Sequence, residues 1–153
     1  MSARLLLTLD DLTRVVAHGV AARANGVAFR ADGGALLIDL RGVALSEWLP
    51  RVDVPVRVTW RLDARGQRLR LEGRVRLGGI ASLLLVPGQH LGGGRMAIDA
   101  LIAAIGLSAA VVARDNTGVE LDLARASGGA WRLESLTLSD GLHAGLVASF
   151  HLR

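Results

Sequence analysis

The sequence contains no cysteine, no lysine and no tyrosine. The absence of cysteine excludes disulfide bonds, thiolate metal sites and cysteine nucleophiles. Because lysine is absent, all 18 basic residues are arginine, and they exceed the 14 acidic residues by a formal net charge of +4. A positive balance suits nucleic acid or an anionic membrane. Arginines interleaved with acids equally suit a solvated surface on which arginine stems cover apolar side chains.

Aromatic residues make up only 3% of the chain, whereas hydrophobic residues make up 51% and the mean hydropathy is +0.40. Few rings and many aliphatic side chains favour a soft interior or an apolar interface between copies of the chain. A length of 153 residues suits one domain with a core of its own, and no linker, repeat or low-complexity tract divides it. We therefore expect residues 1–153 to form a single domain.

Long apolar runs are scarce as well. The run at residues 5–7 stops at Thr8, which makes it too short for a secretory signal peptide. Residues 96–113 form the one stretch long enough to cross a membrane, but Asp99 and Gly106 interrupt it. We interpret this stretch as a buried helix followed by a turn and a strand, and we expect a cytoplasmic protein.

Alternation of apolar and polar residues is the clearest pattern that is present. It recurs over residues 56–62, 69–77 and 142–152. A period of two is typical of strands with one buried and one solvated face. Turn residues predict one hairpin over residues 27–43 and a second over residues 55–77. A change of phase predicts a bulge near Glu134 and Ser135.

Two helices are expected beside these strands. Thr8 is placed to cap a first, amphipathic helix that ends at Asn25 and Gly26. Residues 96–107 predict a second helix that is apolar on nearly every side and is therefore enclosed. The fold class that follows is α+β, with a long curved antiparallel sheet wrapped around the apolar second helix.

No constellation of catalytic groups is evident. The four histidines, at positions 18, 90, 143 and 151, do not have the spacing of a shared metal site. No G-x-S-x-G motif marks a nucleophile, and the carboxylates are scattered beside arginines. The glycine-rich residues 88–95 lack the glycine spacing and the lysine of a phosphate-binding loop. We predict no metal, no cofactor and no enzymatic activity, although an enzyme of an unfamiliar type is a third, weaker alternative.

The most specific charged feature is an arginine-rich face on the second predicted hairpin. It contains Arg57, Arg61, Arg68, Arg70, Arg74 and Arg76. Such a face would contact the phosphates of lipid headgroups or of nucleic acid, or it would simply be solvated. Nucleic acid is the less favoured partner, because Trp60 points with the apolar residues and the face has no aromatic side chain for stacking bases.

The order of these elements resembles the tubular lipid-binding (TULIP) superfamily, in particular its small single-domain bacterial members. The resemblance covers the Leu-Thr-Leu-Asp-Asp-Leu sequence of the first helix, the hairpins, the apolar helix and the closing residues 136–146. It implies a long, highly curved sheet rolled around a helix, with an apolar groove for acyl chains. The small bacterial relatives are typically exported, whereas no signal sequence is recognised here.

The leading hypothesis is non-catalytic binding of a lipid or another apolar ligand between sheet and helix. The expected lining residues are Val58, Trp60, Leu71, Val75, Ile98, Leu101, Ile102 and Ile105. The expected partners are a lipid or amphiphile, an anionic membrane surface that meets the arginine-rich face, and a second copy in a homodimer. The alternative is a scaffold protein whose apolar excess forms a homo-oligomer interface, with the terminal strand pairing across a two-fold axis.

Overall fold

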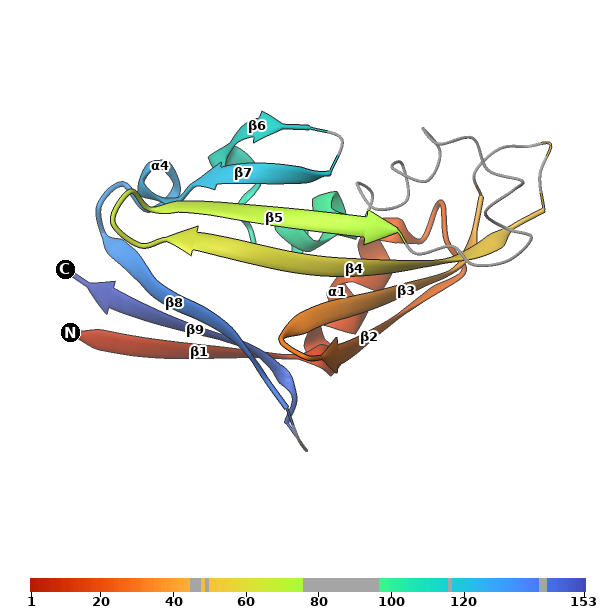
Figure 1. Cartoon of the computed structure of the whole chain (residues 1–153), viewed down its shortest axis with the longest axis horizontal. Coiled ribbons are helices and arrows are strands. Elements are labelled where there is room, and N and C mark those ends of the chain that lie inside the picture. Colours follow the sequence, from red (N-terminus) through yellow and green to blue (C-terminus); the bar gives the residue numbers. More distant parts are fainter. Residues whose placement is uncertain (45–47, 49, 76–96, 116, 141–142) are drawn as a thin grey trace.

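The computed structural model describes residues 1–44, 48, 50–75, 97–115, 117–140 and 143–153. These residues form an α+β fold of antiparallel strands, which confirms that part of the predicted class. The strands lie in two sheets where the sequence predicted one (Figure 1). Arg76 and the glycine-rich residues 88–95 lie outside the described residues.

The larger sheet, sheet B, has the strand order β2-β3-β4-β5-β7-β6. Its strands are β2 (Gly26–Asp32), β3 (Ala35–Val43), β4 (Val52–Asp63), β5 (Arg68–Val75), β6 (Val111–Arg114) and β7 (Gly118–Asp122). Both predicted hairpins are present, as β2–β3 and β4–β5. Gly33 and Gly34 make the first turn with φ angles of 54° and 81°, which only glycine adopts at little cost.

The smaller sheet, sheet A, has the strand order β1-β9-β8. Its strands are β1 (Ser2–Thr8), β8 (Trp131–Ser139) and β9 (Gly145–Leu152). The register of β8 against β9 shifts between Leu133 and Ser135, which confirms the predicted bulge. The terminal strand β9 has a neighbour on each side, so the predicted pairing of that strand across a two-fold axis is wrong. Its backbone hydrogen bonds are already made within the chain.

The first helix, α1 (Leu9–Val20), follows β1 directly. The hydroxyl of Thr8 accepts a hydrogen bond from the backbone N–H of Asp11 at 3.2 Å, which satisfies one of the free amides of the first turn. Leu12, Val16 and Val20 are buried along one stripe of the helix. The helix ends at Val20, one turn before the predicted stop at Asn25 and Gly26.

Residues 97–104 form a second helical segment, followed by η1 (Ser108–Ala110) and strand β6. This order matches the helix, turn and strand expected for the apolar stretch at residues 96–113. Ile98, Leu101 and Ile102 are at most 3% exposed, whereas Ala103 lies on an exposed face, so the segment is buried on one side only. Within the described residues, no helix has the length and apolar character needed to span a membrane.

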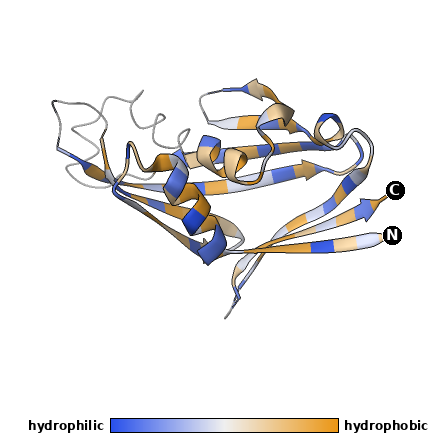
Figure 2. Ribbon diagram, turned by 180° about the vertical axis from the view of Figure 1, so that it is seen from behind, coloured by the Kyte–Doolittle hydropathy of each residue, from blue (hydrophilic) through white to orange (hydrophobic). Residues whose placement is uncertain are grey.

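The short helix α4 (Leu123–Ser127) connects β7 to β8 and so links the two sheets. Asp122 caps its start, and Gly128 ends it with a φ of 56°. Apolar side chains of both sheets belong to one hydrophobic core. Hydrophobic and hydrophilic residues alternate as bands along the strands (Figure 2). The two termini lie together, because the backbone N–H of Leu152 donates to the carbonyl oxygen of Met1 at 2.8 Å.

Candidate ligand-binding cavity

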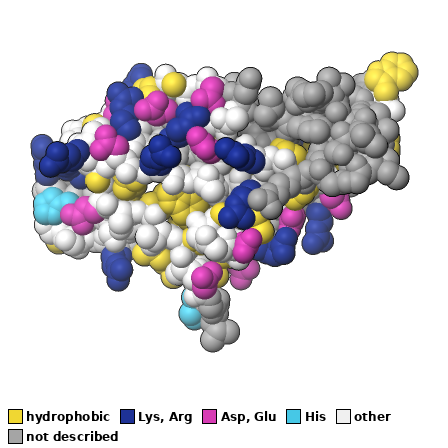
Figure 3. Space-filling view, viewed as in Figure 1, with side chains coloured by type: hydrophobic (Ala, Val, Ile, Leu, Met, Phe, Trp, Pro, Cys, Tyr) yellow, Lys and Arg dark blue, Asp and Glu magenta, His cyan; other side chains and the backbone are white. Residues whose placement is uncertain are grey.

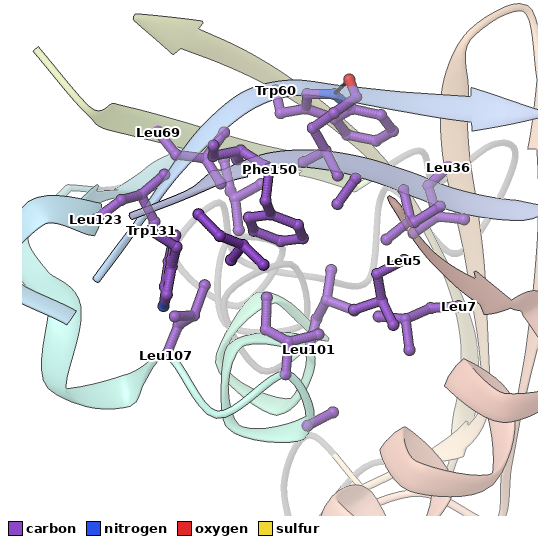
Figure 4. A pocket seen from close by; sticks show the side chains of 18 residues that line it. Leu5, Leu7, Leu36, Trp60, Leu69, Leu101, Leu107, Leu123, Trp131 and Phe150 are labelled. Carbon is purple, nitrogen blue, oxygen red and sulfur yellow. Dashed lines mark hydrogen bonds between the residues drawn. The ribbon is translucent and has the colours of Figure 1, made fainter. Parts of the chain in front are cut away.

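A cavity of about 510 Å³ lies between the two sheets, and every described residue that lines it is apolar (Figure 4). The lining residues are Leu5, Leu7, Leu36, Trp60, Leu69, Leu71, Leu101, Ala104, Ile105, Leu107, Leu123, Trp131, Leu133, Leu136, Leu146, Ala148, Phe150 and Leu152. Cavities of this size and character are typical of sites for small apolar ligands.

Three walls enclose the space. Strands β3, β4 and β5 of sheet B contribute Leu36, Trp60, Leu69 and Leu71. The second wall is sheet A, on which the alternation of β9 places its even-numbered residues toward the cavity. The third wall is the helical segment 97–104, with the residues that follow it and the start of α4. Elements from both halves of the chain are therefore needed to form the cavity.

The cavity is deep on one side and open on another. Leu36 and Leu71 are 0% and 3% exposed, so the sheet B wall is shielded from water. Leu5, on the edge strand β1, is 48% exposed although it also lines the cavity. The gradient of exposure gives the cavity a buried floor and a rim that a ligand can reach from solvent.

Two indole nitrogens are the only polar side-chain atoms among the described lining residues. The N–H of Trp60 donates to the carbonyl oxygen of Leu136 at 2.9 Å and thereby ties sheet B to β8. The ring of Trp131 packs edge-on against Phe150, with centroids 5.3 Å apart and an interplanar angle of 84°. The described lining therefore contains no carboxylate, guanidinium, imidazole or hydroxyl group that could act in catalysis.

Four of the eight predicted lining residues do line the cavity, namely Trp60, Leu71, Leu101 and Ile105. The other four, Val58, Val75, Ile98 and Ile102, lie away from it. Val58, Ile98 and Ile102 are buried within the core, and Val75 is half-buried and packs against it. The four predicted lining residues of the second helix were expected to form one ligand-facing surface. In the structure, Ile98 and Ile102 pack in the core, whereas Leu101 and Ile105 line the cavity.

Sequence reasoning missed the contribution of sheet A, which supplies half of the described lining. Those nine residues are Leu5, Leu7, Trp131, Leu133, Leu136, Leu146, Ala148, Phe150 and Leu152. The alternation of β9 was a usable signal for one buried face, but it did not indicate which element that face would meet. The contiguous apolar residues 5–7 gave no period-two signal for β1.

The arginine-rich face lies on the outer surface of sheet B. The β4–β5 register places Arg57 opposite Arg74 and Arg61 opposite Arg70, which brings them to one face together with Arg68. Acidic residues share this surface, and arginine and acidic side chains are interspersed over sheet B (Figure 3). The face therefore carries charges of both signs.

Three of these arginines are engaged in ion pairs within the chain. Arg57 pairs with Asp32 at 3.4 Å, and Arg68 pairs with Asp122 at 3.7 Å. The third, Arg70, pairs with Glu72 and Asp115. Among the described residues, Arg61 and Arg74 have no ion-pair partner. These two guanidinium groups are therefore the ones that the face offers to an external anion.

Arg70 lies at the centre of the tightest charged cluster on this face. Its Nη2 lies 2.6 Å from Asp115 Oδ2, and its Nε lies 2.9 Å from Glu72 Oε1. The guanidinium group, together with backbone N–H donors from Thr117 and Gly118, holds the pKa of Asp115 well below its usual range. The hydrogen bonds to Glu72 and Asp115 raise the pKa of Arg70. The cluster fixes the β6–β7 turn against β5.

The three described histidines do not form a cluster that could hold a metal ion. His18, His143 and His151 are exposed, and His90 lies outside the described residues. No group of three or more His, Asp or Glu side chains in the described parts of the chain has the geometry to hold a metal ion.

Comparison of the chain with models of protein families, with curated proteins and with solved structures finds no match.

Proposed function

We propose that this protein binds a lipid or a similar apolar ligand, without catalysis, in the cavity between the two sheets. The observation that carries the proposal is an apolar lining from eighteen residues around about 510 Å³ of space. An apolar cavity of this size lies within the range of roughly 300–1,000 Å³ for small-molecule sites. The open rim at Leu5 gives a ligand a route of entry.

Burial of apolar surface supplies the driving force for such binding. Each Å² removed from water contributes about 25 cal/mol, so a single long alkyl chain gains several kcal/mol before the cost of association is subtracted. The described lining offers no charged group that would have to be desolvated for the ligand to enter. Affinity would therefore follow the length and shape of the apolar chain.

The resemblance to the TULIP superfamily supports the same proposal. In that superfamily a highly curved sheet surrounds a helix and leaves a groove for acyl chains. We propose that sheets A and B act together as the curved wall here, with the helical segment 97–104 on the inner side. Because Trp60 and Gln67 both contact β8, the two sheets are joined along one side of the cavity.

Extraction of the purified protein with organic solvent, followed by mass spectrometry, tests the proposal directly. We expect a lipid to copurify, and we expect the delipidated protein to bind a fluorescent fatty-acid analogue that unlabelled lipid displaces. Heat-unfolded protein is the control for adsorption to exposed apolar surface. An extract without lipid, together with a native protein that binds no probe, would show that the cavity is not a ligand site.

A second candidate function is that of a scaffold that assembles through β1. Among the described residues β1 has β9 as its single neighbour, and Leu5 and Leu6 are 48% and 45% exposed. A long apolar edge strand is a template for pairing with a second copy of the chain.

Light scattering with size-exclusion chromatography measures the mass of the assembly. Leu6→Lys should yield monomers, whereas Val15→Lys, at a comparably exposed position on α1, should leave the mass unchanged.

A further inference from the structure

The two indole nitrogens of the cavity differ in what they contact. The N–H of Trp60 is already bonded to the carbonyl oxygen of Leu136 at 2.9 Å. The N–H of Trp131 has no hydrogen-bond partner among the described residues, and its side chain is half-buried at the cavity wall. In Figure 4 this nitrogen lies at the end of the ring nearest Leu107. An indole nitrogen can donate a hydrogen bond but cannot accept one.

The ring that carries this donor is held in place. Trp131 packs edge-on against Phe150 at 5.3 Å, and its backbone pairs with Leu152 in the adjacent strand. A positioned donor on an otherwise apolar wall orients a ligand more than it adds affinity, because the apolar chain supplies most of the energy. The described residues therefore fix one point at which a polar group of the ligand would be recognised.

We infer that the ligand carries an uncharged hydrogen-bond acceptor, such as an ester, ketone or amide oxygen, that accepts from the indole N–H of Trp131. The inference rests on the proposed function and adds the chemical class of the ligand. The alkyl chain then lies toward the buried floor at Leu36 and Leu71. A carboxylate at the same point would lack a cationic partner, because the described lining has no arginine or histidine, and it would lose hydration at a cost.

Three probes of similar length separate these possibilities in the delipidated protein. Decyl methyl ketone carries the acceptor, its isosteric alkene has a methylene group in place of the carbonyl oxygen, and dodecanoate carries a charge. Affinity is measured by displacement of a fluorescent probe. We expect the ratio of ketone affinity to alkene affinity to be roughly three- to tenfold higher in the wild type than in a variant that lacks the Trp131 N–H, as one net hydrogen bond allows, because the cost of desolvating the carbonyl is the same in both proteins. We expect dodecanoate to bind more weakly than the ketone.

Trp131→Phe removes the N–H and keeps an aromatic ring against Phe150. It should lower the ratio of ketone affinity to alkene affinity by that factor, whereas the smaller ring area affects both probes alike. Trp60→Phe is the matched control, because its N–H is used within the protein, and it should leave the ratio of the two affinities unchanged. The same ketone-to-alkene ratio in the wild type and in Trp131→Phe, or wild-type binding of dodecanoate as tight as that of the ketone, would overturn the inference. If the inference fails in this way but the wild type still binds the alkene, the proposed function holds. A wild type that binds none of the three probes would overturn the inference and the proposed function together.

A measurement on the wild type keeps the test independent of the folding of the Trp131→Phe variant. The chain has three tryptophans, and hence three indole N–H resonances in a ¹⁵N correlation spectrum. Trp60→Phe and Trp48→Phe identify two of them, which assigns the third to Trp131. The ketone should move the Trp131 proton resonance downfield, and the alkene should not. An equal shift with both probes, or no shift with either bound, would contradict the assigned hydrogen bond.

Discussion

The side-chain amide of Gln67 and the backbone of Leu133 exchange two hydrogen bonds. Nε2 of Gln67 donates to the carbonyl oxygen of Leu133 at 3.0 Å, and the N–H of Leu133 donates to Oε1 at 2.8 Å. Nε2 also donates to the carbonyl oxygen of Ala64 at 2.7 Å. Gln67 is 5% exposed and has a φ of 53°. The pair joins the β4–β5 turn of sheet B to the bulge in β8 of sheet A, and so positions two walls of the cavity.

Gln67→Ala should destabilise the protein by about 2–4 kcal/mol, because it leaves both backbone groups of Leu133 without their partner in a buried setting. Chemical denaturation measures the free energy of unfolding. Arg132→Ala is the matched control, because Arg132 also donates to Ala64 but is exposed, and it should cost less than about 1 kcal/mol. Equal effects of the two substitutions would show that the Gln67 amide does not hold the sheets together.

The parts of this fold that the sequence predicts are those with a regular pattern. Period-two alternation and turn residues predicted both hairpins and the bulge in β8. Helical spacing placed Leu101 and Ile105 on one apolar stripe with Ile98 and Ile102, of which only the first two line the cavity. Other parts lack such a pattern. The contiguous apolar residues 5–7 do not alternate, so β1 was missed. The role of Gln67 depends on a residue 66 positions away, which local propensity does not encode.

Leu101→Trp should block the cavity without unfolding the protein. Leu101 is 3% exposed and lines the space, so an indole at that position would extend into the room that a ligand needs. We expect uptake of a fluorescent fatty-acid analogue to fall, at an overpacking cost of roughly 1–3 kcal/mol. Ala103→Trp is the control, because it places the same side chain on the exposed face of the same helical segment. Full binding by the Leu101 variant would place the ligand elsewhere.

Ile102→Asp should prevent folding. Ile102 is 2% exposed and belongs to the core, as its place on the apolar helix predicts, and it does not line the cavity. A carboxylate there would be desolvated without a partner, at a cost of several kcal/mol. Soluble yield and the melting curve measure the effect. Ala103→Asp, one residue further on at an exposed position, should leave both unchanged.

Arg61→Glu with Arg74→Glu tests whether the arginine-rich face meets anionic headgroups. Arg70 is left unchanged because Glu72 and Asp115 already hold it. The double variant should stay within about 1 kcal/mol of the wild type in stability, as exposed substitutions usually do. Binding to anionic vesicles should fall, and wild-type binding should weaken with salt. Arg4→Glu with Arg23→Glu makes the same change in net charge elsewhere. If the wild type does not bind such vesicles at low salt, the arginine-rich face does not contact anionic headgroups and is simply exposed to solvent.

Stability should fall in acid partly because of Asp115. Its pKa is lowered in the folded protein by Arg70 and by the N–H donors of Thr117 and Gly118, and is ordinary in the unfolded chain. A lowered folded-state pKa means that the carboxylate stabilises the fold above the ordinary value of about 4, and that this contribution is lost as the pH falls further. Asp115→Asn keeps an oxygen that can accept from Thr117 and Gly118 but removes the charge.

The difference in unfolding free energy between wild type and Asp115→Asn isolates this contribution from the other carboxylates, because both proteins share them. The difference should be constant near neutral pH, should begin to shrink below about pH 4, and should approach zero or change sign in strong acid. It should also be smaller at high salt, because Asp115 and Arg70 are open to screening by solvent ions. Urea denaturation at a series of pH values measures it. A difference that does not change with pH would show that the charge of Asp115 does not stabilise the β6–β7 turn, and that its hydrogen bonds to the backbone act alone.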